Sequence, residues 1–150
     1  MELRMIHNEV NPAAYEAMKS LESFVLQSSL DEAILDLIQL RVSQINGCSF
    51  HMNVNGKALY DKGDQFERIL LLNVWRDVPN FSKKEKAALE LAEHLTKVSK
   101  LRVPEQVYKQ VREHFNEQQY IDLVMAINVS NCWNRLAIAT GMTPGCSLEK

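Results

Sequence analysis

Cys48 and His51 are the pair of residues in this sequence most suited to chemistry. Asn46 and Gly47, directly before Cys48, tolerate left-handed backbone angles and favour the end of one helix. Cys48 would then stand in the first turn of the next helix, where the helix dipole favours a thiolate. His51 would lie on the same face of that helix and could hydrogen-bond to the sulfur. The spacing therefore predicts a reactive thiol, which is not by itself evidence of an enzyme.

The composition is that of one globular, helical domain spanning residues 1–150. Hydrophobic residues make up 46% of the 150 residues and charged residues 24%, while Gly and Pro number five and four. This balance favours helices over a loop-rich β fold. A net charge of −2 indicates no nucleic-acid partner. Because no apolar run approaches the ~20 residues that span a bilayer, and the start lacks a signal-peptide pattern, we expect no membrane partner and a cytoplasmic location.

Three cysteines, an odd number, argue against a disulfide framework and for thiols that are reduced at rest. Cys132 is expected in the core, and Cys146 has no assigned role. The sequence contains no zinc-finger, metalloprotease or phosphate-loop pattern, so we expect neither a metal nor another cofactor. A metal site at Cys48 and His51 would need a further ligand, and no spacing links the other candidate donors to them: His7, His94, His114 and Asp36.

Apolar spacing and capping residues predict six to seven helices joined by short connections, as in a compact bundle. The first runs from Asn11-Pro12 to about Gln27, and the second starts at a capping box, Ser29 to Glu32, and ends at Asn46-Gly47. The remaining predicted helices cover residues 48–62, 64–72, 82–98, 104–115 and 116–141, and those that start at Asp64, Ser82 and Asn116 open with further capping boxes. The last of these is apolar on most of its circumference, which favours burial against a second copy of the chain.

The segment from residue 40 to 50, Leu-Arg-Val-Ser-Gln-Ile-Asn-Gly-Cys-Ser-Phe, resembles the signature of AhpD-like alkylhydroperoxidases in the carboxymuconolactone decarboxylase superfamily. Further similar segments follow in the same order: Trp75-Arg76, Phe81 to Ala88, Val103 to Tyr108, and Asn131 to Ala137. Together they cover roughly residues 30 to 140. The resemblance implies an all-α, AhpD-like fold and a homo-oligomer such as a trimer or hexamer.

The family's redox pattern is a glutamate, a Cys-x-x-Cys pair and a histidine, and only part of it is present here. The first cysteine corresponds to Cys48, whereas the second corresponds to His51. The glutamate position holds Asp36, and the family histidine is replaced by Asn55. At 1.5 Å per residue, Asp36 and Asn55 lie ~15 and ~12 Å back from the turn on two paired helices, so they could meet. Because Asn55 has no titratable proton and His51 no thiol, the family's dithiol cycle is not available to this pair.

We therefore predict single-thiol reduction of a small hydroperoxide. Cys48 would be the nucleophile, His51 its acid-base partner and Asp36 a supporting catalytic carboxylate, with Asn55 and Phe50 binding substrate and an external thiol as reductant. Cys48 could alternatively be an inert buried residue, and His51 a replacement that merely fills space. Two other functions remain open. One is a lactone enzyme like carboxymuconolactone decarboxylase, and the other is a non-catalytic oligomer that binds a small ligand.

Overall fold

The computed structural model describes residues 2–146, and every regular element in that range is helical. The all-α prediction is confirmed. The described chain forms, in order, α1 (His7–Val10), α2 (Pro12–Leu26), α3 (Glu32–Asn46), α4 (Ser49–Asp61), α5 (Phe66–Leu71), the 3₁₀-helix η1 (Leu72–Val74), α6 (Lys83–Thr96), α7 (Val98–Leu101), α8 (Glu105–Arg112) and α9 (Glu117–Thr140). The four-residue helices α1 and α7 were not predicted.

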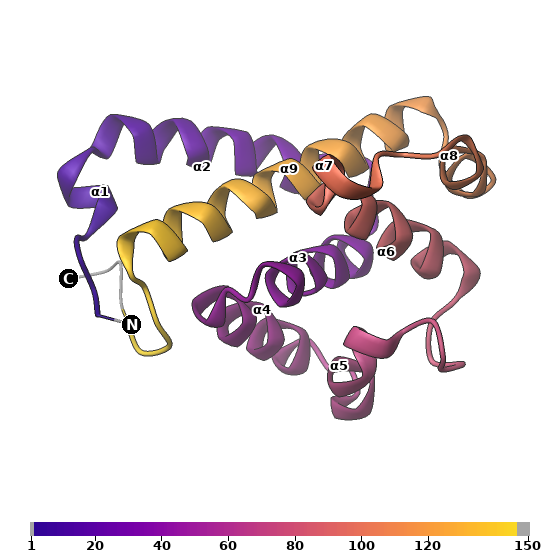
Figure 1. The fold of residues 1–150 in the computed structure, drawn as a ribbon, viewed down its shortest axis with the longest axis horizontal. Coiled ribbons are helices and arrows are strands. Elements are labelled where there is room, and N and C mark those ends of the chain that lie inside the picture. Colours follow the sequence, from indigo (N-terminus) through magenta and orange to yellow (C-terminus); the bar gives the residue numbers. More distant parts are fainter. Residues whose placement is uncertain (1, 147–150) are drawn as a thin grey trace.

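Helix α3 is the central element, because it packs against α4, α6 and α9 (Figure 1). One side of it contributes Ile38 and Val42, both fully buried, to a core shared with α6, α8 and α9. Leu37 and Leu40 belong to a second core, which also holds Leu72 of η1. Helix α2 lies along α9 on the far side of that helix from α6. Apolar residues on two sides of α3 therefore join the two cores of the bundle.

Several helix ends confirm the predictions. The Asn11 side chain accepts a hydrogen bond from the Ala14 N–H, and Pro12 occupies the first turn of α2. Ser82 and Asn116 each form a complete capping box, at the starts of α6 and α9. Gly47 ends α3 with φ 64°, the left-handed conformation that its position predicts.

Two predicted capping boxes are wrong. Helix α3 begins at Glu32, and the Ser29 hydroxyl donates instead to the Asp122 carboxylate on α9, at 3.0 Å. Helix α5 begins at Phe66, and the Asp64 carboxylate accepts instead from the side chain of Arg68. In both cases a side chain finds another partner and the helix starts later in the sequence.

No helix in residues 2–146 combines the length and the apolar character needed to cross a membrane.

Candidate active site

The turn between α3 and α4 fixes Cys48 at the start of α4. Gly47 reverses the chain, and the Cys48 N–H then donates to the carbonyl of Ser43 at 3.0 Å. The carbonyl of Cys48 accepts from the N–H of Met52, which closes the first turn of α4. Only 1% of Cys48 is exposed to solvent. The predicted position in the helix is confirmed, and the thiol is buried there.

Cys48 and His51 contact each other as their spacing predicts. The Sγ atom of Cys48 lies 3.3 Å from Nδ1 of His51. Burial raises the pKa of the Cys48 thiol, although the N–H groups of His51 and Phe50 act in the opposite direction. Burial, with a smaller effect of His7, lowers the pKa of His51 to about 4. Both groups are therefore neutral near pH 7, and the expected thiolate is not the resting form.

The neutral pair still permits proton transfer. A thiol can donate its proton to Nδ1 in the imidazole tautomer that carries its own proton on Nε2. The imidazole is then a base held within hydrogen-bonding distance of the sulfur.

Asp36 and Asn55 do not pair as the sequence suggested they could. Asp36 accepts from Nζ of Lys62 at 2.7 Å, and Glu32 binds the same ammonium group. Asn55 donates instead to the hydroxyl of Ser43 at 3.2 Å. Lys62, beyond the last residue of α4, reaches back to the level of Asp36 and neutralises it. Asp36 thus lines a separate depression with Lys62, away from His51.

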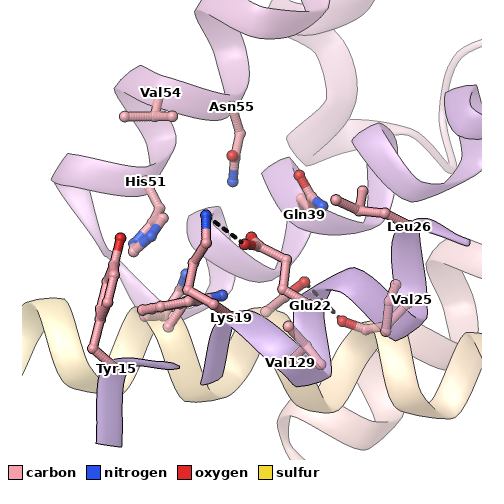
Figure 2. Close-up of a pocket in the computed structure, with 14 residues that line it drawn as sticks. Tyr15, Lys19, Glu22, Val25, Leu26, Gln39, His51, Val54, Asn55 and Val129 are labelled. Carbon is pink, nitrogen blue, oxygen red and sulfur yellow. Dashed lines mark hydrogen bonds and ion pairs between the residues drawn. The ribbon is translucent and has the colours of Figure 1, made fainter. Parts of the chain in front are cut away.

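His51 and Asn55 share a pocket of about 180 Å³ between α2, α3, α4 and α9. Figure 2 shows His51, Asn55, Tyr15 and Lys19 around it. Its 14 lining residues are Tyr15, Lys19, Glu22, Val25, Leu26, Gln39, His51, Val54, Asn55, Ala126, Val129, Ser130, Trp133 and Asn134. Lys19 and Glu22 form an ion pair at 3.8 Å and add charge to an otherwise mixed wall. The pocket has room for a small organic molecule.

A buried hydrogen-bond network holds the pocket wall in place. The Ser43 hydroxyl donates to the carbonyl of Gln39 and accepts from both Asn55 and Asn134. Asn134 also accepts from the side chain of Asn46. One hydroxyl therefore uses its single donor and both acceptor sites to join α3, α4 and α9.

Aromatic side chains close the α2 side of the site. The rings of Tyr15 and Trp133 meet edge to face with centroids 5.6 Å apart, and His7 packs against both. The indole Nε1 of Trp133 is buried and finds no hydrogen-bond acceptor among the described residues. A ligand with an acceptor oxygen could satisfy that donor.

Phe50, the last of the predicted site residues, lies near the thiol. The ring of Phe50 meets that of His51 edge to face, 5.0 Å between centroids, and packs against the thiol cluster formed by Cys48, Ala137 and Met142. Phe50 is not among the residues that line the pocket. Cys146 also packs against the thiol cluster, whereas Cys132 lines a groove with His7 and Leu136.

The pocket residues on α2 and α9 were not predicted from the sequence. The α2 residues have no motif that distinguishes them from an ordinary exposed helix face. Ser130 and Asn134 could have been suspected, because they are polar residues within the most apolar helix. Within residues 2–146 no three His, Cys, Asp or Glu side chains gather as metal ligands would.

Several known proteins are similar to this chain in sequence. A model of the carboxymuconolactone decarboxylase family matches residues 12–94. The uncharacterized protein YdfG of Bacillus subtilis is 41% identical over 141 residues, which cover 94% of this chain and 96% of YdfG. The uncharacterized protein YnjA of Escherichia coli is 27% identical over 105 residues, which cover 70% of this chain and 57% of YnjA.

Two solved structures resemble the fold. A protein of unknown function from Agrobacterium tumefaciens, provisionally described as antioxidant defence protein AhpD, has a TM-score of 0.92 and 30% identity. The match covers 95% of this chain and 99% of that one. An uncharacterized peroxidase-related protein from Ralstonia eutropha has a TM-score of 0.79 and 20% identity, with 94% of this chain and 75% of that chain covered, which supports the fold alone.

Proposed function

Because this chain belongs to the carboxymuconolactone decarboxylase family, we propose that it reduces a small hydroperoxide with the thiol of Cys48. The observation that carries the proposal is the 3.3 Å contact between Sγ of Cys48 and Nδ1 of His51. The provisional antioxidant description of the Agrobacterium relative agrees with it. The lowered pKa of His51 leaves its imidazole neutral at pH 7, so Nδ1 is free to accept the thiol proton, although as a weak base.

The reaction requires two proton transfers and one bond exchange. The thiol gives its proton to Nδ1 of His51 while the sulfur attacks the outer oxygen of the hydroperoxide. The oxygen–oxygen bond breaks, and the imidazolium returns the proton to the leaving alkoxide, which gives an alcohol and a sulfenic acid on Cys48. An external thiol then forms a mixed disulfide with release of water, and a second thiol restores Cys48.

The pocket beside His51 is the proposed binding site for the organic part of the substrate. Its volume suits a molecule of a few carbon atoms, and Asn55 and the Trp133 indole offer donors for oxygen atoms. Cys48 contacts His51 but does not itself line this pocket, and it is almost out of solvent, which keeps its resting thiol from oxidants that do not enter the site. Such a cycle also needs a compartment rich in reduced thiols, such as the cytoplasm.

The test is consumption of a small organic hydroperoxide with dithiothreitol as reductant. We expect Cys48→Ser to lose the thiol-dependent rate and Cys132→Ser, which alters the groove on the other face of α9, to retain it. Circular dichroism of both variants checks that the helices are intact. A Cys48→Ser protein as active as the original chain would contradict the proposal and favour thiol-independent chemistry, such as that of a lactone enzyme.

One observation favours a second function, binding of a small ligand without catalysis. Burial raises the pKa of Cys48, so the thiol alone is a weak nucleophile at pH 7. Trp133 lines the pocket, so its fluorescence reports an occupant. Saturable quenching by small carboxylic acids, in a protein that consumes no hydroperoxide with any of several reductants, would establish this function in place of the first.

A further inference from the structure

The chain turns back on itself after α9 and covers the thiol. Gly141 ends α9 in the left-handed conformation, with φ 78°, and the N–H of Met142 donates to the carbonyl of Ala137 at 2.9 Å. This arrangement directs the Met142 side chain inward, where only 4% of it is exposed. Met142 and Ala137 then enclose Cys48 in the thiol cluster. The turn is thus part of the wall around the sulfur.

The N-terminal segment holds this turn in place. The N–H of Arg4 donates to the carbonyl of Thr140 at 2.8 Å, and its guanidinium donates to the carbonyl of Ala139. A methyl group on Gly141 would lie 2.1 Å from the carbonyl oxygen of Glu2, so the two segments are in direct contact. The position of the turn is therefore determined by packing on both sides.

Cys146 lies at the end of this turn and packs against the thiol cluster. Its N–H donates to the carbonyl of Thr143 at 3.0 Å, and its sulfur accepts from the Thr143 N–H at 3.4 Å. Pro144 and Gly145, directly before it, are exposed. The backbone that carries Cys146 can therefore shift without disturbing buried side chains.

We propose that Cys146 is the second thiol of this site and closes a disulfide with Cys48. The inference rests on the proposed function for its chemistry, because the oxidant is the hydroperoxide. The thiol of Cys146 attacks the sulfur of the Cys48 sulfenic acid, the sulfur–oxygen bond breaks, and the hydroxide leaves as water with the thiol proton. A dithiol reductant then opens the disulfide by exchange and is itself oxidised.

This assignment gives a role to a cysteine that lies 98 residues from Cys48 in the sequence (146 − 48). His51 occupies the place where a neighbouring second thiol would stand, so a resolving thiol has to come from another segment. Cys132 does not meet the requirement, since it lines the groove with His7, Leu136 and Met5 and is not part of the thiol cluster. Of the other two cysteines, only Cys146 packs against the thiol cluster that contains Cys48.

The test treats the full chain with one equivalent of hydrogen peroxide in the presence of dimedone, which traps sulfenic acid. Alkylation of free thiols, digestion without reductant and mass spectrometry follow. We expect a linked Cys48–Cys146 peptide in the original chain and in Cys132→Ser. In Cys146→Ser we expect no such link and several-fold more dimedone on Cys48, because the sulfenic acid then lacks a partner.

Two results separate failure of this inference from failure of the proposed function. Equal dimedone labelling of Cys48 in the original chain and in Cys146→Ser, with Cys146 alkylated in the former, would overturn the disulfide while leaving the peroxidase chemistry intact. If hydrogen peroxide modifies Cys48 in neither protein, the proposed function fails. Diamide then tests the pairing alone: a Cys48–Cys146 link supports it, and its absence overturns it.

Discussion

Cys48 stands at a helix start, where the dipole lowers a thiol pKa, and within an apolar cluster, where burial raises it. The dipole contributes about 1 kcal/mol at most at an ordinary helix end, whereas full burial shifts a pKa by up to about 3–5 units. Burial is the larger effect here, and it raises the pKa of Cys48. The nucleophile therefore depends on proton removal by His51 during the reaction.

The pH dependence of Cys48 alkylation follows from this balance. We expect the rate with iodoacetamide to rise steadily up to alkaline pH, because burial holds the thiol pKa above its usual value. Mass spectrometric labelling of Cys48 against pH measures it, with the urea-unfolded chain as the control for an unperturbed thiol. A rate that reaches its plateau below pH 7 would mean that a thiolate is the resting form after all.

His51 also links stability to pH. Its folded pKa of about 4 lies below the unfolded value of about 6.5, so unfolding takes up a proton between these limits. The stabilisation by His51 is therefore nearly complete above pH 6.5 and falls as pH approaches 4, by about 2–3 kcal/mol at pH 4.5. Urea unfolding at pH 7.5 and pH 4.5 measures the loss. His51→Gln should show a smaller one, and equal losses would contradict the assigned pKa.

Among the helices, α9 ends in a contact that a single methyl group would break. We expect Gly141→Ala to lower the free energy of unfolding by more than about 2 kcal/mol, because the new Cβ would collide with the Glu2 carbonyl. Gly47→Ala is the matched control: Gly47 also ends a helix in the left-handed conformation, but nothing lies within 4 Å of its added Cβ. It should cost about 1 kcal/mol. Chemical denaturation gives both values, and equal costs would exclude the collision.

The sequence predicts elements well where the deciding contacts are local. Ser82 and Asn116 cap their helices through residues three positions away, and both capping boxes form as predicted. At Ser29 the local pattern is equally good, yet Asp122 on a distant helix takes its hydroxyl. The same limit applies to the site. The Cys48–His51 contact follows from helical spacing, whereas the pocket wall from α2 and the approach of Cys146 depend on packing between distant segments.

At the scale of the whole molecule, a buried carboxylate joins three separate segments. Glu93 on α6 accepts from Arg41 on α3 and from the Trp75 indole, each at 2.9 Å, and from Arg76 at 2.7 Å. Only 8% of Glu93 is exposed. Hydrogen bonds from the Trp75 indole, Arg76 and Arg41 hold the pKa of Glu93 below its usual range despite burial. Loss of its charge would leave two guanidinium groups without their shared partner.

We expect Glu93→Gln to lower the free energy of unfolding by roughly 3 kcal/mol, the cost of removing one member of a buried ion pair. Glu105→Gln is the control, because Glu105 forms an ion pair of 3.6 Å with Lys109 in which both side chains are exposed. Its effect should stay within about 0.5 kcal/mol. Thermal and urea unfolding of the two variants decide the point, and similar small effects would show that the Glu93 cluster contributes little.

The assembly of several copies remains a prediction. Helix α5 exposes 67% of Phe66 and 61% of Leu70, which lie one turn apart on the same face. A second copy that covers them would remove this apolar surface from water. We expect sedimentation equilibrium to give a trimer or hexamer, and Phe66→Ser to shift it toward smaller species. Glu67→Ser, on the same helix, is the control, and a monomeric original chain at micromolar concentration would refute the prediction.

The cover over Cys48 also has a consequence for biosynthesis. Ala137 and Met142, which enclose the thiol, leave the ribosome long after Cys48 and His51 have emerged. Until α9 docks against α3, the nascent chain presents the same thiol in water, with an ordinary pKa and open to any oxidant. Completion of folding, rather than reduction, is then the step that protects Cys48. Oxidation of this residue outside the proposed catalytic cycle should therefore fall mainly on newly made chains.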